Sequence, residues 1–329
     1  MSSVVDRAVA SAGSETSLAV ATGLAAPDDD ELPDADTSPA IAETRSLVPA
    51  RARAQGAERV QTALFVTSLT VIGVLILCAL VPDAIAPYRA GEMDANATLV
   101  PPFSAGHILG TDQFGRDVLS LIVFGARQSL LLASLATIGS IGVGVFVGLT
   151  AGYAGGLVDM LLMRLVDVWM AIPAVLLGIA VCAALGPSVP TLVLSVSAAL
   201  APRYARVLRG HALALRGRGF IEAARIAGAS HPAIVFRHVL PHCIAPILVL
   251  GTIGAGWAII IGSSLSFLGF GVNGDRPDWA YLIAQGRSYL TVAWWTVTFP
   301  GIAIGVFVVA TNLLGDSLGR RLGSRGENR

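Results

Sequence analysis

Long apolar runs without charged residues constrain the fold of this chain more than any other feature of its sequence. A helix needs about 20 apolar residues to cross the roughly 30 Å of hydrocarbon in a bilayer. Helices are also the open-ended structures that satisfy every backbone polar group in lipid. We therefore predict an all-α membrane protein with six transmembrane helices. The six runs are 63–81, 128–158, 160–185, 191–202, 243–274 and 288–315.

The charge content supports this class and excludes others. Only 13% of the residues are charged, against about 25% in soluble domains. A formal net charge of zero gives no sign of nucleic-acid binding. All 22 basic residues are arginine, so the chain cannot supply the lysine of a phosphate-binding P-loop. We expect a non-catalytic chain without a metal or cofactor of its own, in which any ATP and Mg²⁺ used belong to partner chains.

The runs divide the chain into three regions. Residues 1–58 are rich in Ala, Ser, Pro and acids and are predicted to be a disordered N-terminal tail. No apolar core follows the first residues, so this start is not a secretory signal. Residues 59–320 form the predicted transmembrane domain, with an outer loop at 83–120 and a cytosolic region at 203–241. Residues 321–329 form a C-terminal tail.

Arginine placement predicts the orientation in a cell membrane. Seven arginines follow the fourth run within 203–238, and others precede the first run and follow the sixth. These three regions lie on one side if there are six spans, and cytoplasmic loops are the arginine-rich ones. Both termini are therefore predicted to be cytosolic in a multi-pass protein of the cytoplasmic membrane.

The segment 217–241 reads as two short helices around a corner. We expect a helix over 220–227, a left-handed C′ residue at Gly228, and a second helix capped by Ser230 with Pro232 in its first turn. Pro241 is expected to mark entry into the fifth span.

Small residues give the first of these helices a face that another protein can approach closely. Ala223, Ala224 and Ala227 form this face, Phe220 and Ile221 add an apolar knob, and Glu222 adds a charge. From the residues alone, two interpretations stay open: a docking element on the cytosolic side, or a simple connector.

The same segment resembles the EAA signature of ABC importer permeases. Glu222-Ala223-Ala224, then Gly228, then Leu240-Pro241 match it, and His238 resembles the peptide-permease branch. Further likeness lies at 107–120, 264–272 and 312–322, so the resemblance covers roughly 60–320. It is to the C-type permease subunit of dipeptide, oligopeptide and nickel importers, which has a type I importer fold.

This resemblance implies partners and roles. It implies a second, related permease subunit, two ABC ATPase subunits that bind ATP and Mg²⁺, and an extracytoplasmic substrate-binding protein. Phe220, Glu222, Ala223, Ala224 and Gly228 would couple the chain to an ATPase. Peptides are the implied substrate, with nickel or glutathione as alternatives. A secondary transporter driven by an ion gradient is a more distant rival, but no internal repeat supports it.

Three other groups of residues have two open interpretations each. Thr111, Asp112, Arg116 and Asp117 either receive the binding protein or stabilise the outer loop. Arg164 and Asp167 lie three apart and can pair on one helical face, or line the pore. His238 and His242 lie four apart, but Pro241 separates them and no third ligand is evident, which favours structural histidines over a metal site.

Overall fold

The computed structural model describes residues 50–89, 91–104, 106–271 and 278–326. Within these ranges the regular secondary structure is helical. A long loop before Val118 contains two isolated β-bridges. The described helices are α3 (Ala50–Leu80), α4 (Pro82–Ile85), α5 (Val118–Ala154), α6 (Gly156–Ala171), α7 (Ala174–Leu185), α8 (Val189–Arg216), α9 (Gly219–Ile226), α10 (His231–Ile234), the π-helical η2 (Val235–Val239), α11 (Leu240–Leu265), the π-helical η3 (Ser266–Phe270), α12 (Trp279–Gly286), the 3-10 helix η4 (Arg287–Tyr289) and α13 (Trp295–Gly326).

The chain separates into two units, Met1–Gly56 and Ala57–Arg329, and the second contains every described helix but the start of α3. Most of the predicted tail, residues 1–49, lies outside the described residues. Helix α3 begins at Ala50, inside the predicted tail, and the boundary between the two units, after Gly56, lies close to the predicted end of the tail at residue 58. Alanine, arginine and glutamine dominate 50–58, and these residues favour helix.

Four continuous helical segments are long and apolar enough to cross a membrane: Arg59–Leu80, Val118–Ala154, His231–Phe270 and Trp295–Leu322. A fifth candidate is the pair α6 and α7, which bends by 90° at its break. Pro173 follows the break and forces Ile172 into extended backbone. The remaining predicted span is α8. Its second half holds four arginines, so α8 is not among the segments apolar enough to cross a membrane. The all-helical membrane class is confirmed.

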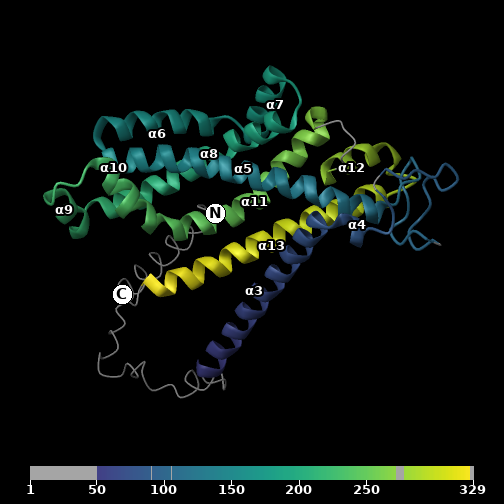
Figure 1. Ribbon diagram of the computed structural model, residues 1–329, viewed down its shortest axis with the longest axis horizontal. Coiled ribbons are helices and arrows are strands. Elements are labelled where there is room, and N and C mark those ends of the chain that lie inside the picture. Colours follow the sequence, from purple (N-terminus) through teal and green to yellow (C-terminus); the bar gives the residue numbers. More distant parts are fainter. Residues whose placement is uncertain (1–49, 90, 105, 272–277, 327–329) are drawn as a thin grey trace, which may run out of the picture. The chain divides into compact units, whose positions relative to one another are not determined.

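Helices α5 and α8 form the centre of the bundle and lie side by side (Figure 1). Gly144, Gly148 and Gly152 of α5 allow this approach, because a Cβ atom at any of them would collide with α8. Small residues spaced by four let membrane helices pack closely. The main hydrophobic core joins these two helices to α7, α11 and α13, with Leu192, Val196, Leu265 and Trp279 among its fully buried residues.

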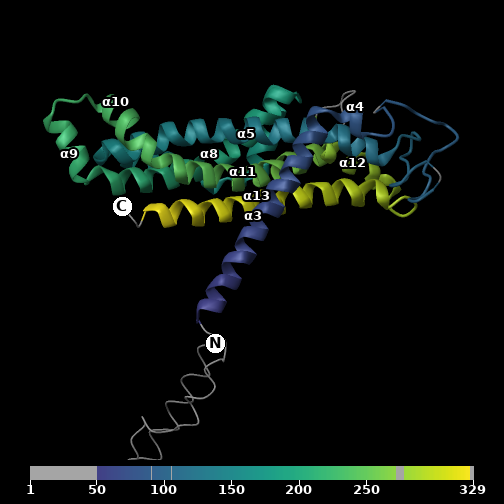
Figure 2. The same cartoon turned by 60° about the horizontal axis from the view of Figure 1, so that its bottom comes forward.

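The bundle has two distinct ends (Figures 1 and 2). Helices α9 and α10 lie at one, together with the C-terminal end of α13, and we call this the elbow end. Helices α4 and α12 and the loop before α5 lie at the other, the loop end. The arginine-rich segment 203–241 and the end of α13 thus lie at the same end of the bundle, opposite the loop before α5.

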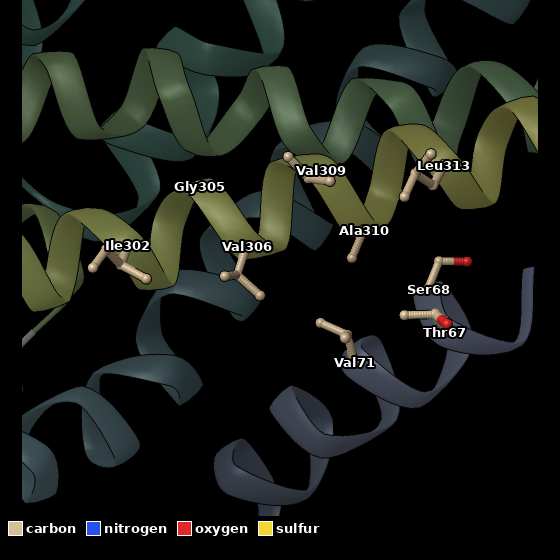
Figure 3. A pocket seen from close by; sticks show the side chains of 9 residues that line it. All are labelled: Thr67, Ser68, Val71, Ile302, Gly305, Val306, Val309, Ala310 and Leu313. Carbon is tan, nitrogen blue, oxygen red and sulfur yellow. The ribbon is translucent and has the colours of Figure 1, made fainter. Parts of the chain in front are cut away.

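Leu75, Cys78 and Ala79 of helix α3 pack against the bundle core, and an apolar groove lies between α3 and α13 (Figure 3). Val71 of α3 faces Val306 and Ala310 of α13 across a space of about 400 Å³. The Ser68 hydroxyl, at the rim, donates to the Phe65 carbonyl of its own helix at 2.9 Å. The groove therefore offers apolar surface and few polar groups.

Candidate functional site

Helix α9 ends at a glycine in a conformation that other residues adopt at a cost. Gly228 has a φ of 82°, the left-handed region predicted for it. The Ala229 N–H donates to the Ala224 carbonyl at 3.0 Å, and the Gly228 N–H donates to the Arg225 carbonyl at 3.1 Å. These two bonds form a Schellman cap, so the predicted corner is confirmed.

The two sides of α9 differ sharply in exposure. Ile221 is fully buried against the bundle, and Ala224 is half-buried beside it. Glu222, Ala223 and Ile226 are exposed, as is Ala227 just past the helix, and the Ile226 side chain is 88% exposed. Residues four apart share a helix face. The exposed Ala223 and Ala227 therefore lie beside Glu222 and Ile226 in one strip, in which Ile226 is the large apolar side chain.

Two predictions about this face are wrong. Ile221 is not part of an exposed knob, because it points into the bundle, and Ala224 lies on that inner side too. Phe220 is only 38% exposed, and its ring stacks on His242 with the ring centroids 5.2 Å apart. Residue spacing shows which side chains share a face, but it does not show which face packs inward. The most exposed apolar side chain of α9 is that of Ile226, which residue spacing did not indicate.

The inner side of α9 rests on a separate hydrophobic cluster, which we call the joint cluster. It brings together the ends of α5 and α8, the elbow helices α9 and α10, and the start of α11. Its buried members are Leu149, Tyr153, Leu208, Ala212, Leu215, Ile221, Ile234, Val239 and Cys243. Displacing α9 therefore disturbs buried contacts with three long helices.

The second half of the elbow differs in part from its prediction. Ser230 occupies the N-cap position of α10, but its side chain makes no capping hydrogen bond. Pro232 lies in the first turn, as predicted. The helix then continues from His231 to Phe270 through the π-helical turn η2, so Pro241 lies inside it and does not mark its start. Proline is tolerated there because it falls in the first turn after the π-helical segment, where η2 has already changed the hydrogen-bond register.

At the loop end, Asp112 and Arg116 form a tight internal pair. The Arg116 Nε–H donates to Asp112 Oδ2 at 2.7 Å, and Asp112 Oδ1 accepts from the backbone N–H groups of Phe114 and Arg116. A further guanidinium N–H donates to Gln285 Oε1 of α12 at 3.0 Å. Both charged side chains are largely buried, at 7% exposure for Asp112 and 13% for Arg116.

Thr111 and Asp117 have internal partners as well. Asp117 caps α5, because its Oδ2 accepts from the Ser120 N–H at 2.8 Å and from the Ser120 hydroxyl at 2.7 Å. Its Oδ1 lies 3.1 Å from His107 Nδ1. Thr111 is fully buried, and its carbonyl accepts from Trp295 Nε1–H at 2.9 Å. These contacts favour the stabilised-loop interpretation for all four residues.

Apolar side chains make up much of what the loop exposes. Phe103 is 85% exposed, and Met93, Ile108 and Phe114 are exposed too. Phe103 also has a φ of 64°, which is unfavourable for a bulky residue. Its N–H donates to the Ile108 carbonyl at 3.0 Å, which fixes the turn that holds the ring outward.

Asp278 starts α12 at the same end. Its carboxylate accepts from the Tyr281 N–H at 2.6 Å. Burial raises the pKa of this carboxyl, and hydrogen bonds from two backbone N–H groups of the helix oppose that rise only in part.

The predicted pair of Arg164 and Asp167 is wrong. Asp167 pairs with Arg206 of α8 at 2.5 Å, and both side chains are half-exposed. About two turns earlier, Asp159 of α6 pairs with Arg209 of α8, with Arg209 Nη2 2.6 Å from Asp159 Oδ2. The Asp167 carboxylate thus pairs with an arginine of the adjacent helix α8 and not with Arg164, three residues away on its own helix. Two ion pairs between helices thus tie α6 to α8.

The histidine pair has a structural arrangement. His242 Nδ1 lies 2.7 Å from the His238 carbonyl, and its ring stacks on Phe220. Among the described residues, no group of three or more His, Cys, Asp or Glu side chains could hold a metal ion. A third histidine has a partner that sequence spacing could not indicate: His231 Nδ1 lies 2.9 Å from the Tyr153 hydroxyl, 78 residues away.

The chain is similar in sequence to one family of membrane transport proteins. Residues 144–326 match the family model described as binding-protein-dependent transport system inner membrane component. A dipeptide transport system permease protein DppC of Alkalihalophilus pseudofirmus is 38% identical over 255 residues, covering 78% of this chain and 84% of the relative. The DppC protein of Escherichia coli K12 is 39% identical over 258 residues, covering 77% and 86%. A di/tripeptide permease of Pseudomonas aeruginosa is 37% identical over 249 residues, covering 74% and 82%.

One solved structure is similar in fold. It is a chain of the MetNI methionine ABC transporter in an inward-facing conformation, with a TM-score of 0.50 and 19% identity. The match covers 62% of this chain and 96% of that one.

Proposed function

We propose a function from one established premise: this chain belongs to the family of binding-protein-dependent transport system inner membrane components. The chain is the membrane-spanning permease subunit of an ABC importer that brings peptides, dipeptides or oligopeptides, into the cytoplasm. Peptide substrates are supported by the names of relatives that are 37 to 39% identical.

The observation that carries the proposal is the exposed strip on α9. Ala223 and Ala227 leave the backbone open to close approach, and Ile226 stands out from them as an apolar anchor. A large exposed apolar side chain flanked by small ones suits a pocket on a partner surface. We assign that pocket to an ATPase subunit, because this chain lacks a P-loop lysine and needs a separate ATP-binding, Mg²⁺-binding partner.

The joint cluster supplies the mechanical connection. Ile221 anchors α9 in the same buried cluster as Leu149 of α5, Leu208 of α8 and Cys243 of α11. Packed interiors transmit displacement, since they have few voids that could absorb it. Closure of an ATPase pair would move α9, and the three long helices would follow, so that access to the pore changes sides.

The loop end is proposed to face the binding protein. Thr111, Asp112, Arg116 and Asp117 support the loop from within, so direct contact falls to the exposed apolar residues, with Phe103 foremost. On this proposal the elbow end lies on the cytosolic side of the membrane, and both chain termini are cytosolic. A second, homologous permease subunit completes the pore beside this chain in the bilayer.

Co-purification with variants at Ile226 tests the proposal. Extraction in mild detergent should bring the ATPase subunits away with the wild-type chain, and the Ile226→Glu variant should lose them while it stays monodisperse. Leu213→Glu is a matched control, because Leu213 is an exposed leucine on α8 outside the strip. Retention of the ATPases by Ile226→Glu at wild-type levels would contradict the assignment of α9.

A further inference from the structure

The hydrogen bond between Tyr153 and His231 links two parts of the chain that the proposed mechanism needs to move together. Tyr153 lies in the last turn of α5 and is 9% exposed. His231 is the first residue of α10, three positions after the corner at Gly228. The hydroxyl oxygen lies 2.9 Å from Nδ1, and the ring centroids are 5.8 Å apart in an edge-on arrangement.

The surroundings make this contact mechanically significant. A cavity of about 460 Å³ separates the last turns of α5 from α10 and η2, and Tyr153 and His231 line it together with apolar residues such as Val145 and Phe236. The two segments also share apolar contacts in the joint cluster, through Leu149 of α5, Ile234 of α10 and Val239 of η2. Among the hydrogen bonds of the described side chains, this one alone joins α5 to α10.

The π-helical turn η2 adds a second reason. It separates α10 from α11 immediately after the elbow. Short π-helical turns interrupt the regular hydrogen-bond ladder and are weaker points of a helix. A push on α9 could therefore be absorbed at η2 before it reaches α11, unless α10 is also fixed to a second helix.

We propose that Tyr153 and His231 are positioning residues for ATP coupling, which presumes the role of α9 given above: their hydrogen bond fixes α10 to α5, so that movement of α9 carries α5 with it. Apolar contacts in the joint cluster are non-directional, and they permit α10 to rotate against α5. A hydrogen bond has a preferred direction and restrains that rotation. The contact can persist in either protonation state of the imidazole, because the hydroxyl can donate to Nδ1 or accept from it.

A set of substitutions isolates the hydrogen bond from packing. Tyr153→Phe removes only the hydroxyl, and His231→Phe removes the ring nitrogen. His231→Asn keeps a polar side-chain atom near the position of Nδ1. Tyr88→Phe is the matched control, because the Tyr88 hydroxyl donates to the Gly106 carbonyl at 2.9 Å at the loop end, far from the joint cluster.

The direct readout is the distance between spin labels on the assembled transporter, at the exposed Arg225 of α9, which is not one of the strip residues, and at the exposed Leu135 of α5. With wild-type Tyr153, this distance should be the same without nucleotide and after trapping with ATP and vanadate, because α9 and α5 move as one body. Tyr153→Phe and His231→Phe should change or broaden it, and their double variant should add nothing further. His231→Asn and Tyr88→Phe should match the wild type.

A second readout is peptide uptake per ATP hydrolysed, in vesicles with tri-alanine as the probe. Tyr153→Phe should lower this ratio by about fivefold, the effect expected for one lost hydrogen bond, without lowering the amount of assembled complex. Unchanged label distances in Tyr153→Phe, or equal falls in assembly and uptake, would overturn the positioning role. If the wild-type chain does not bind ATPase subunits at all, the proposed function itself fails, which is a different result.

Discussion

Substitution of Gly228 tests the elbow through its backbone conformation alone. An added Cβ atom at Gly228 would meet no atom within 4 Å, so the cost of a side chain there is conformational and not steric crowding by neighbours. At a φ of 82° an L-residue pays about 1 to 2 kcal/mol. Asparagine pays less because it tolerates this region, and valine pays most because it is β-branched.

The penalty falls on a short helix that cannot stand alone. Helix α9 has eight residues, and isolated helices shorter than about 12 residues are marginal in water. A substitution that destabilises the docked α9 conformation by about 1.4 kcal/mol lowers its equilibrium constant against the undocked conformation tenfold. The docked population falls by nearly the same factor where the two conformations are close in free energy. We expect ATP-driven uptake to fall in the order Gly, Asn, Ala, Val, with Gly228→Val close to inactive.

The assay compares peptide uptake with the amount of inserted chain and with hydrogen exchange at the amides of α9. Gly210→Ala in α8 is the matched control, because its site is equally open and lies inside a regular helix, where alanine is favoured. Insertion should be unchanged in every variant. Normal transport by well-inserted Gly228→Val, or equal damage from asparagine and valine, would refute the reasoning.

Three further predictions concern other contacts. Ile221→Ala should cost about 3 kcal/mol at the joint cluster and speed tryptic cleavage after Arg225; an unchanged cleavage rate would mean that Ile221 does not anchor α9. Asp117→Ala should lower the thermal unfolding midpoint in detergent, since an N-cap is worth about 1 kcal/mol, whereas Asp117→Asn should lower it less; equal midpoints for both variants and the wild type would exclude a capping role. Because the folded-state pKa of Asp278 is raised, stability should fall as the pH rises from the ordinary aspartate value through the raised one. Asp278→Asn keeps the cap and should remove that slope in unfolding midpoints measured across the range, and a slope that persists would assign it to another group.

The all-helical class could be predicted because an uncharged apolar run of this length must satisfy its backbone polar groups in lipid, which a helix does. The corner at Gly228 could be predicted because glycine after a helix-forming segment has a specific backbone role. The ends of the helices were harder to predict from the sequence. Helix α5 begins at Val118, ten residues before its uncharged run, because Arg127 is accommodated within the helix. The 90° bend at Pro173 and the arginines of α8 also changed the expected spans.

Contacts between distant segments could not be predicted from spacing. Asp167 lies three residues from Arg164, yet it pairs with Arg206 on another helix. Ile221 and Ile226 look equivalent in the sequence, but the fold buries one and exposes the other. Spacing left Thr111 and Asp112 either receiving the binding protein or stabilising the outer loop, and their burial favours the second interpretation.

Cross-linking from Ala227 tests the central claim most directly. In a Cys78→Ala background, which leaves the buried Cys182 and Cys243 as the native thiols, Ala227→Cys should form an adduct with an ATPase subunit in native membranes. Phe103→Cys at the loop end, equally exposed for reaction, should form none with that subunit. An assembled transporter in which Ala227→Cys reacts with reagent but never with an ATPase would contradict the account.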